Sequence, residues 1–404
     1  MIRFISMFMV FSLVAWPATG DDGENVPDLK LKKSQLDLPK DIASFKTLRI
    51  LLLKNEQSIA VGTDGPYGVF DDKGRMLKQG EQLVSTKALA VDEGIQLGTE
   101  LFRYPSITLI SEGGGLSLNK HFYRNAIRFW KDADGKLAVN NEIDIEDYLK
   151  GVLPWEANPK WPVEALKAQA IASRTFALFK AIQHRDDPYD MKSGVLSQVY
   201  VGKKIEHRLT SAAIDTTRGQ ILTYRGKIFP GFFHSTCGGA TASVAAVWNL
   251  EPNPVLEGVS CEFCRGTKHY RWSARIPENE ILTIFHKQGY NFQAIQEISA
   301  GKKDKSGRAR FFVVHYKQTK QLQFNSDDFR SWLGLDRFKS TLVDAIEKQG
   351  DAFLFRGRGW GHGVGLCQYG MKVMAELGYN AKQILDYYYS GADIIGTEKN
   401  AAAF

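Results

Sequence analysis

The sequence predicts an α+β fold, with a β-rich N-terminal region and a second domain around a buried helix. Short apolar runs separated by turn signals fill residues 46–135, which favours β structure. A long apolar helix is expected over residues 162–184, and strand candidates follow it at 221–224, 228–234 and 311–316. The length of 404 residues, with 44% hydrophobic and 24% charged side chains, suits one large soluble domain or two smaller ones.

Residues 1–20 have the form of a secretory signal peptide. Arg3 carries a positive charge, residues 4–16 are almost uniformly apolar, and residues 18–20 are small at the spacing that a signal peptidase recognises. The apolar stretch is shorter than the roughly 20 residues of a membrane span. We therefore expect an exported protein, in the periplasm, in the cell wall or outside the cell. A membrane contact is expected only through an uncleaved signal segment.

The remaining chain divides by composition. Residues 21–45 are polar and rich in Lys and Asp, and predict a linker or loose arm. The β-rich region over 46–135 has strand candidates at 48–53, 106–110 and 126–130, separated by turn signals such as Asp64-Gly65-Pro66. The second domain is expected over residues 136–395, with a helix near 383–389, and residues 396–404 form a tail.

The helix over 162–184 should lie inside the second domain. Pro162 suits the first helical position, because its missing N–H would be unpaired there anyway, and Glu164 complements the helix dipole. The following side chains are apolar or small nearly all round, so the helix should pack on more than one side. Arg174 falls among apolar residues and needs a partner, either in a structural ion pair or in a functional site.

A candidate catalytic carboxylate, Glu156, lies between Trp155 and Trp161 on a proline-rich loop that leads into the helix. An apolar setting raises the pKa of a carboxyl group by desolvating its charged form. A general acid for glycosidic cleavage needs such a raised pKa, because it must hold its proton near neutral pH. Two other interpretations stay open: an exposed loop residue, or an ion-pair partner for Arg174.

Glycine occupies every second position from Gly357 to Gly365. In a strand this pattern would leave one face as bare backbone, open to close approach by a ligand or another segment. The other face would carry Arg358, Trp360, His362 and Val364, which could bind a sugar by stacking and hydrogen bonds. A tight crossing in the core, with His362 merely satisfied, is the alternative. The run does not fit a dinucleotide-binding motif.

Cys237, Cys261 and Cys264 form the most informative cysteine group. Export makes a disulfide permissible, and we expect Cys237 to pair with Cys261 or Cys264. The same residues with a histidine have the chemistry of a tetrahedral zinc site, which stays open as the less favoured metal interpretation because only one C-x-x-C is present. Free thiols are the third interpretation that stays open. Otherwise we expect no cofactor.

Two functional classes are disfavoured. The formal net charge of +7 comes from scattered basic residues, so no nucleic-acid partner is expected. His234 and Ser235 are neighbours in the sequence, but no G-x-S-x-G elbow is present, which argues against a serine hydrolase.

Several motifs in the second domain resemble the SpoIID/LytB domain family, and their order and number make the resemblance specific. They span about residues 140–390, and residues 46–135 fit more loosely as the β-rich region before the signature. The matching segments are Asp147–Leu153, Glu156, Trp161-Pro162, Glu164–Ala170, Ser173–Leu178, Ser197–Tyr200, Thr217–Gly219, His234-Ser235 with Gly238-Gly239, Gly359–Gly365 and Gln368–Gly370.

The resemblance implies a lytic transglycosylase that acts on peptidoglycan glycan strands, classically in sporulation, with Glu156 at the position of the catalytic glutamate. Glu156 would protonate the glycosidic oxygen between N-acetylmuramic acid and N-acetylglucosamine. It would then take the proton from the muramyl 6-hydroxyl, which gives a 1,6-anhydro end without a second carboxylate, unlike a two-carboxylate glycosidase. Position and motif predict that five further residues bind substrate: Arg174, His234, Trp360, His362 and Gln368.

The LytB side of the family implies a second function, a wall-binding enhancer of a cell-wall amidase without catalysis of its own. Glu156 between two tryptophans favours the enzyme, since a pure binder needs no acid there. Some members carry a His and two Cys after the helix and are thought to bind zinc. Residues 184–200 hold no cysteine here, which argues against a zinc site at that place.

Overall fold

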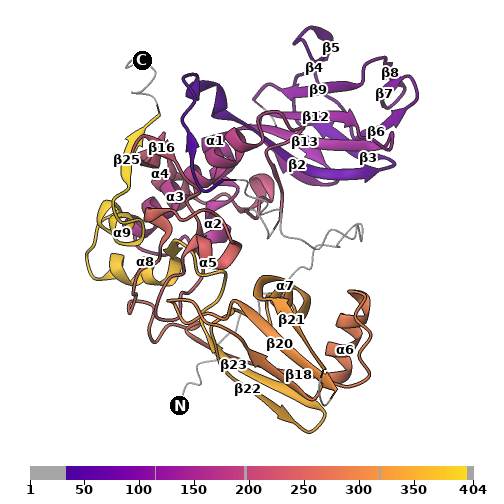
Figure 1. Ribbon diagram of the computed structural model, residues 1–404. Helices are drawn as coiled ribbons and strands as arrows, with labels where there is room; N and C mark the ends of the chain where they lie inside the picture. The colour runs from indigo at the N-terminus through magenta and orange to yellow at the C-terminus, as the bar shows by residue number, and fades with distance from the viewer. Residues whose placement is uncertain (1–32, 114, 195–197, 318–319, 398–404) are drawn as a thin grey trace, which may run out of the picture.

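The chain folds into a β-rich N-terminal part, a helical centre and a smaller C-terminal β unit (Figure 1). A computed structural model describes residues 33–397 except 114, 195–197 and 318–319. The predicted signal peptide and residues 21–32 of the predicted linker therefore lie outside the described residues. Mixed sheets and helices of this kind confirm the expected α+β class. No helix in the described ranges combines the length and apolarity needed to cross a membrane.

Two sheets form the N-terminal part, one with the strand order β11-β10-β3-β6-β7-β8 and one with the order β14-β2-β13-β12-β9-β4-β5. The strands are antiparallel except at one edge of the second sheet, where β14 pairs in parallel with β2. Side chains alternate as a half-buried strand requires: Ile107 and Leu109 are buried while Thr108 between them is partly exposed. The three predicted strands all form, as β2, β9 and β12. The strands of this part are β2 (Thr47–Glu56), β3 (Ile59–Thr63), β4 (Tyr67–Phe70), β5 (Met76–Gly80), β6 (Thr86–Val91), β7 (Gly94–Leu97), β8 (Glu100–Phe102), β9 (Ser106–Ser111), β10 (Leu116–Leu118), β11 (His121–Tyr123), β12 (Ala126–Lys131), β13 (Leu137–Asp144) and β14 (Met191–Lys192).

The long helix predicted over 162–184 is α3 (Val163–Gln183), and it lies at the centre of the molecule. Nearly every side chain from Ala165 to Ala181 is buried, as expected for a helix that packs on more than one side. Its neighbours are α1 (Ile145–Lys150), α2 (Leu153–Glu156), α4 (Arg208–Thr216), β15 (Gln220–Tyr224), α8 (Gln368–Glu376) and α9 (Ala381–Tyr388). The predicted helix near 383–389 corresponds to α9.

Part of the predicted loose arm is packed. β1 (Leu36–Asp37) pairs with β16 (Lys227–Ile228) in a small sheet completed by β15 and β25 (Asp393–Gly396). The following one-turn helix, η1 (Ile42–Lys46), buries Ile42 and Phe45 in the main core. The linker prediction is therefore wrong over residues 36–45, because apolar side chains among the charged ones find a surface to cover.

The strand predicted over 228–234 is interrupted. Only β16 and β17 (Phe233–His234) form, because Pro230 has no N–H for a sheet ladder. At Gly231 the backbone also lies against α3, where an added Cβ would come 2.7 Å from the Ala172 carbonyl oxygen. The chain therefore turns at this point, and β17 pairs in parallel with β24 (Leu366–Cys367).

Residues 271–358 form a unit with a hydrophobic core of its own, inside the range 136–395 that the sequence assigned to one domain. Phe285, Phe312 and Phe329 lie fully buried in this core. The predicted strand 311–316 forms as β20. The unit contains the sheets β18-β23-β22 and β19-β20-β21 with two helices: β18 (Arg271–Pro277), α6 (Glu278–Lys287), β19 (Glu297–Ala300), β20 (Phe311–Lys317), β21 (Lys320–Asn325), α7 (Ser326–Leu333), β22 (Val343–Gln349) and β23 (Ala352–Arg358).

Candidate active site

Glu156 is the last residue of the one-turn helix α2, directly before the segment that enters α3. Pro154 in the first turn of α2 lacks the N–H that would be unpaired there. Leu153 and Ala157 on either side of the turn are completely buried. These anchors hold the carboxylate on a rigid piece of backbone, as a catalytic group requires.

A cleft of about 930 Å³ opens in front of Glu156, between the helical centre and the C-terminal unit. Its size suits an extended ligand, and its walls are rich in aromatic rings, which can stack on sugar rings. Trp155, at the mouth, is 58% exposed. The lining aromatic residues are Trp155, Trp161, Phe176, Phe232, Phe233, Trp248, Trp360 and Tyr369, and the polar ones are Glu156, Asn158, Lys160, His234, Ser235, Asp327, Arg330, Ser331, Asp336, His362 and Gln368.

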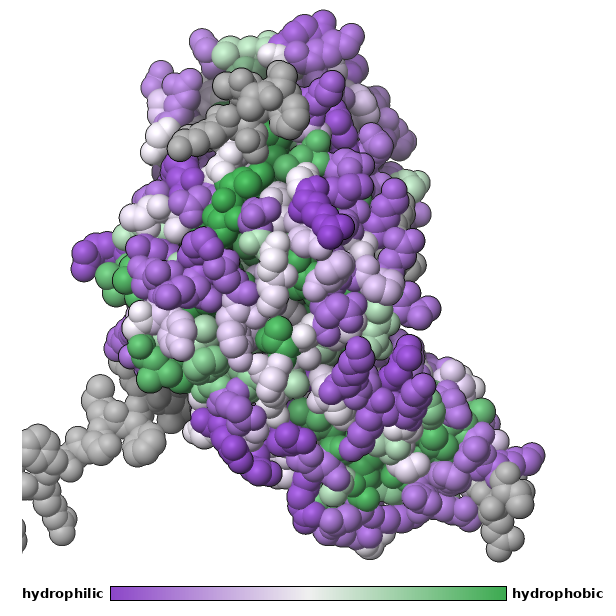
Figure 2. Space-filling view, turned by 60° about the vertical axis from the view of Figure 1, so that its left-hand side comes forward, coloured by the Kyte–Doolittle hydropathy of each residue, from purple (hydrophilic) through white to green (hydrophobic). Residues whose placement is uncertain are grey.

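The face of the molecule in Figure 2 is mostly hydrophilic, with apolar side chains showing between the hydrophilic ones in separate patches. The largest apolar residues with marked exposure are also scattered along the chain. Single exposed apolar residues are normal on soluble proteins. The aromatic cleft therefore stands out as the place where apolar and titratable groups converge.

The carboxyl group of Glu156 is half-buried and accepts two hydrogen bonds. Gln368 Nε2 donates to Glu156 Oε2 at 3.3 Å, and the backbone N–H of Val199 donates to the same carboxyl group. No Lys or Arg side chain forms an ion pair with Glu156 in the part of the chain that the structure describes. Burial therefore dominates and raises its pKa to about 7, against the two hydrogen bonds that lower it.

Gln368 and Glu156 come from distant parts of the chain and meet in the cleft. Gln368 is the first residue of α8, and only 7% of it is exposed. An uncharged donor holds the carboxyl group in place without stabilising its charge as strongly as an arginine would. Gln368 therefore lines the cleft and helps to hold the Glu156 carboxyl group in one orientation.

The two predicted histidines line the cleft as neutral rings. His362 Nδ1 accepts the Val364 N–H at 3.1 Å, so Nε2 carries the proton and donates to the Phe233 carbonyl at 2.9 Å. Burial lowers the pKa of His362 well below its usual value, and lowers that of His234 to about 3. Both ring nitrogens of His362 are therefore satisfied by backbone, and its ring packs 4.9 Å from Trp248. His362 therefore has no free ring nitrogen with which to transfer a proton in the cleft.

His234 differs from His362 in which ring nitrogen carries the proton. Its Nδ1 bonds the Val364 carbonyl at 3.1 Å, so Nδ1 carries the proton and Nε2 is an acceptor. That Nε2 is buried and has no hydrogen-bond partner among the residues that the structure describes. A buried acceptor without a partner is rare in folded proteins.

The glycine run is a loop instead of a strand. β23 ends at Arg358, and Gly359, Gly361, Gly363 and Gly365 have φ angles of +78°, +109°, +88° and +72°. These angles favour glycine, and an added Cβ at Gly365 would come 2.1 Å from the Phe232 carbonyl oxygen. The close approach expected from the pattern is made by the segment 232–238. The loop places Trp360 in the cleft wall, with Lys339 Nζ 3.8 Å from its ring centre.

A second carboxylate, Asp327, lines the same cleft and was missed in the sequence. It sits in the first turn of α7, within the C-terminal unit. Burial raises its pKa to about 6, and within the described part of the chain its Oδ2 has no hydrogen-bond partner. The pattern Asn325-Ser-Asp327-Asp328 is an ordinary helix start, so its sequence carries no signal of a site.

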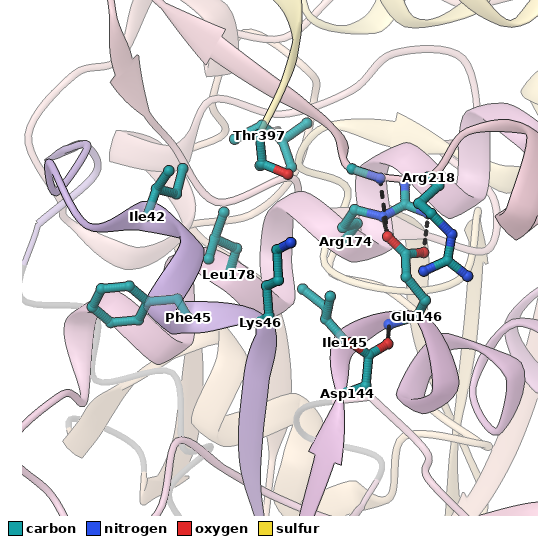
Figure 3. A pocket seen from close by; sticks show the side chains of 12 residues that line it. Ile42, Phe45, Lys46, Asp144, Ile145, Glu146, Arg174, Leu178, Arg218 and Thr397 are labelled. Carbon is teal, nitrogen blue, oxygen red and sulfur yellow. Dashed lines mark hydrogen bonds and ion pairs between the residues drawn. The ribbon is translucent and has the colours of Figure 1, made fainter. Parts of the chain in front are cut away.

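Arg174 does not line this cleft, which corrects its predicted place in substrate binding. It is 1% exposed, and its Nη2 lies 2.7 Å from Glu146 Oε2 in a buried ion pair. Figure 3 shows Arg174 and Glu146 facing each other, and Glu146 also accepts the Gly219 N–H at 3.0 Å. The ion pair is structural, because it is buried and joins α3, which carries Arg174, to α1, which carries Glu146.

The cysteines form a group of four instead of the predicted pair. Cys237, Cys261, Cys264 and also Cys367 are buried free thiols, and their sulfurs all lie within 4.8 Å of one another. No disulfide joins them, so the preferred pairing of Cys237 is not found. Cys367 joins the three predicted residues although it lies 103 positions after Cys264 in the sequence.

Comparison with known proteins agrees with the fold and the motifs. A family model described as "Stage II sporulation protein" (SpoIID) matches residues 133–224, which contain α1 to α4 and Glu156. A model described as "Domain of unknown function (DUF8618)" matches residues 245–365.

Three relatives show how far the similarity extends. An uncharacterized protein of Brachyspira hyodysenteriae is 32% identical over 357 residues, which cover 87% of this chain and 94% of the relative. "Stage II sporulation protein D" of Bacillus subtilis is 27% identical over 267 residues, 62% of this chain and 74% of the relative. "Amidase enhancer" of Bacillus subtilis is 26% identical over 289 residues, 61% of this chain but 40% of the relative.

The fold and the site define a two-core α+β protein with an acid in an aromatic cleft. With these relatives, the chain belongs to the SpoIID/LytB family. That membership gives it a role related to the cell wall.

Proposed function

We propose that the protein is an exported lytic transglycosylase that cleaves peptidoglycan glycan strands. The observation that carries the proposal is a half-buried Glu156 without an ion-pair partner, whose pKa near 7 suits proton donation at neutral pH. The aromatic cleft around it supports a sugar polymer as the substrate, because exposed and half-buried rings line its length.

Glu156 performs both proton transfers in this mechanism. The protonated carboxyl donates to the glycosidic oxygen while the bond from the muramyl C1 to that oxygen breaks. The muramyl 6-hydroxyl then bonds to C1, and its proton passes to the Glu156 carboxylate. The acid is restored within one turnover, with no water consumed and a 1,6-anhydro end formed. Gln368 and the Val199 N–H keep the carboxyl group oriented during both steps.

The direct test is mass spectrometry of glycan strands, with and without stem peptides, after incubation with the protein. Anhydromuramyl ends support the proposal. Reducing ends would replace it with hydrolysis. Binding without cleavage would replace it with the amidase-enhancer function, which the name of one relative suggests.

The pH profile gives a second test. The carboxyl group must be protonated at the start, so kcat/KM should be maximal below pH 7 and fall about tenfold per pH unit above it. His234, His362 and Asp327 should not contribute above pH 7: burial holds the two histidines neutral, and Asp327, with a pKa of about 6, is already ionised there. The profile is measured with glycan binding at each pH as the control. A flat profile from pH 6 to 9 would contradict the role of Glu156.

Asp327→Asn separates transglycosylation from hydrolysis. With one carboxylate sufficient, the variant should still produce anhydromuramyl ends, with a loss of rate of about tenfold or less from altered substrate contact. A hydrolase would need Asp327 as the base for a water, and would lose about 10²–10⁴-fold. Asp328→Asn, next to it on α7 and outside the cleft lining, is the matched control.

A further inference from the structure

We propose that Cys237, Cys261, Cys264 and Cys367 together hold one structural Zn²⁺ ion as a tetrathiolate site. The four thiols come from three separate segments: the turn after β17, the loop before β18, and β24 at the start of α8. All four residues are completely buried. This inference does not depend on the activity proposed for the cleft.

The arrangement of the sulfurs fits one metal ion. A tetrahedral zinc site with Zn–S bonds of about 2.3 Å separates its sulfurs by about 3.8 Å. All four sulfurs here lie within 4.8 Å of one another, and the Cys237 and Cys264 sulfurs are 3.3 Å apart. Cys261 and Cys264 also have the C-x₂-C spacing of zinc ligands. One ion therefore satisfies all four thiols, which release their protons as it binds.

The groups around the sulfurs are hydrogen-bond donors, as expected beside metal-bound thiolates. Cys367 Sγ accepts backbone N–H bonds from Cys237 at 3.2 Å and from Gly370 at 3.3 Å. The hydroxyl of Tyr388, itself buried, lies 3.2 Å from Cys261 Sγ and can donate to it. Such contacts orient the ligands of a metal and stabilise their charge.

A buried arginine supplies the charge that a zinc tetrathiolate needs. Arg308 is 1% exposed, and its guanidinium donates to the Cys237 carbonyl at 2.6 Å and to the Ala240 carbonyl at 2.9 Å. Among the described residues no carboxylate pairs with this guanidinium, and its Nε has no partner. A buried unpaired cation is costly, whereas Zn²⁺ with four thiolates carries a net charge of about −2 beside it.

The surrounding backbone makes room for this arginine. An added Cβ at Gly363 would come 2.4 Å from the Arg308 guanidinium carbon. Gly363 also has a φ of +88°, which favours glycine. Position 363 therefore needs a glycine because the guanidinium of Arg308, which balances the charge of the proposed metal site, lies against it.

The proposed ion would hold one wall of the cleft. Cys367 directly precedes Gln368, which bonds Glu156, and Cys237 follows the strand that carries His234. Loss of the ion should therefore release the start of α8 and the segment 233–237 from each other. This consequence for Glu156 rests on the proposed function, but the binding of the metal does not.

Metal analysis of the full chain, purified from an exporting host without added zinc, tests the site. We expect one zinc per chain, four titratable thiols after denaturation with a chelator, and thiolate-to-metal charge-transfer absorption after replacement by Co²⁺. One iron per chain would overturn the assignment to zinc. A mass four hydrogens lower, with no metal, would show two disulfides and overturn the site.

Variants provide a readout that does not require catalysis. Cys264→Ser should lose the zinc and lower the melting temperature. If it fails to fold, Arg308→Met gives an independent measurement: zinc release to a chelator should be about 10–100-fold faster. Arg356→Met, which removes an exposed guanidinium paired with Glu347, is the control and should release zinc at the wild-type rate. Equal release from both variants would remove the role of Arg308, and metal-free wild-type protein would remove the site itself.

Discussion

Glu156→Gln should abolish the formation of anhydromuramyl ends while glycan binding is retained. Glutamine keeps the size of the side chain and can still accept the Val199 N–H, but it has no proton to give at neutral pH. General acid catalysis contributes about 10²–10⁴-fold, and the same group acts twice here, so a loss of at least about 10³-fold is expected. The measurement is the appearance of anhydromuramyl ends by mass spectrometry.

The same variant should be more stable than the wild type at alkaline pH. The folded protein raises the pKa of Glu156 from 4.5 to about 7, so the stability contributed by its protonated form is present below pH 4.5 and is lost as pH rises through 7. At pH 8 the wild type therefore bears a cost of about 1–3 kcal/mol that glutamine avoids. Urea unfolding at pH 5 and pH 8 measures it. A variant less stable than wild type at pH 8 would show that the carboxylate is well solvated, and would weaken its assignment as the acid.

Arg174→Ala should destabilise the fold by about 3–5 kcal/mol, because it leaves Glu146 buried without its cation. Arg174 also donates to the carbonyl oxygens of Gln220 and Ile214, which would lose a partner. The free energy of unfolding from urea titration checks the magnitude. The double variant Arg174→Met with Glu146→Leu should recover most of the loss, since neither charge then remains buried.

A matched control for this pair lies at the surface. Arg218→Ala removes an exposed arginine that pairs with Asp215, and exposed pairs contribute about 1 kcal/mol or less. If Arg174→Ala is as mild as Arg218→Ala and glycan cleavage is lost, Arg174 would be a substrate ligand after all. Loss of stability with normal cleavage by the folded fraction would support the structural role.

Local patterns predicted much of this molecule. The helix α3 follows from an unbroken run of good helix formers after Pro162, and β2, β9 and β12 follow from alternating apolar residues between turns. Glu156 is a candidate acid because it lies among tryptophans and prolines, and the resemblance to the SpoIID/LytB motifs selects it over the other interpretations. Where the signal is local in the sequence, periodicity and turn chemistry are enough to find it.

Contacts between distant segments could not be predicted in this way. Asp327 meets the cleft because the unit 271–358 folds against the helical centre, and Gln368 meets Glu156 across 212 positions. Cys367 joins three other thiols only through the parallel pairing of β24 with β17. Position in the sequence gives no measure of these distances, because tertiary packing sets them.

The sequence by itself determined the class of the fold, the central helix and the identity of the candidate acid, since each depends on residues that are neighbours in the chain. Only the tertiary structure decided the protonation of that acid, the structural place of Arg174 and the gathering of the four cysteines. Burial sets the first, because the pKa of a carboxyl group depends on the water that the fold excludes. The other two depend on which side chains the fold brings within a few ångströms.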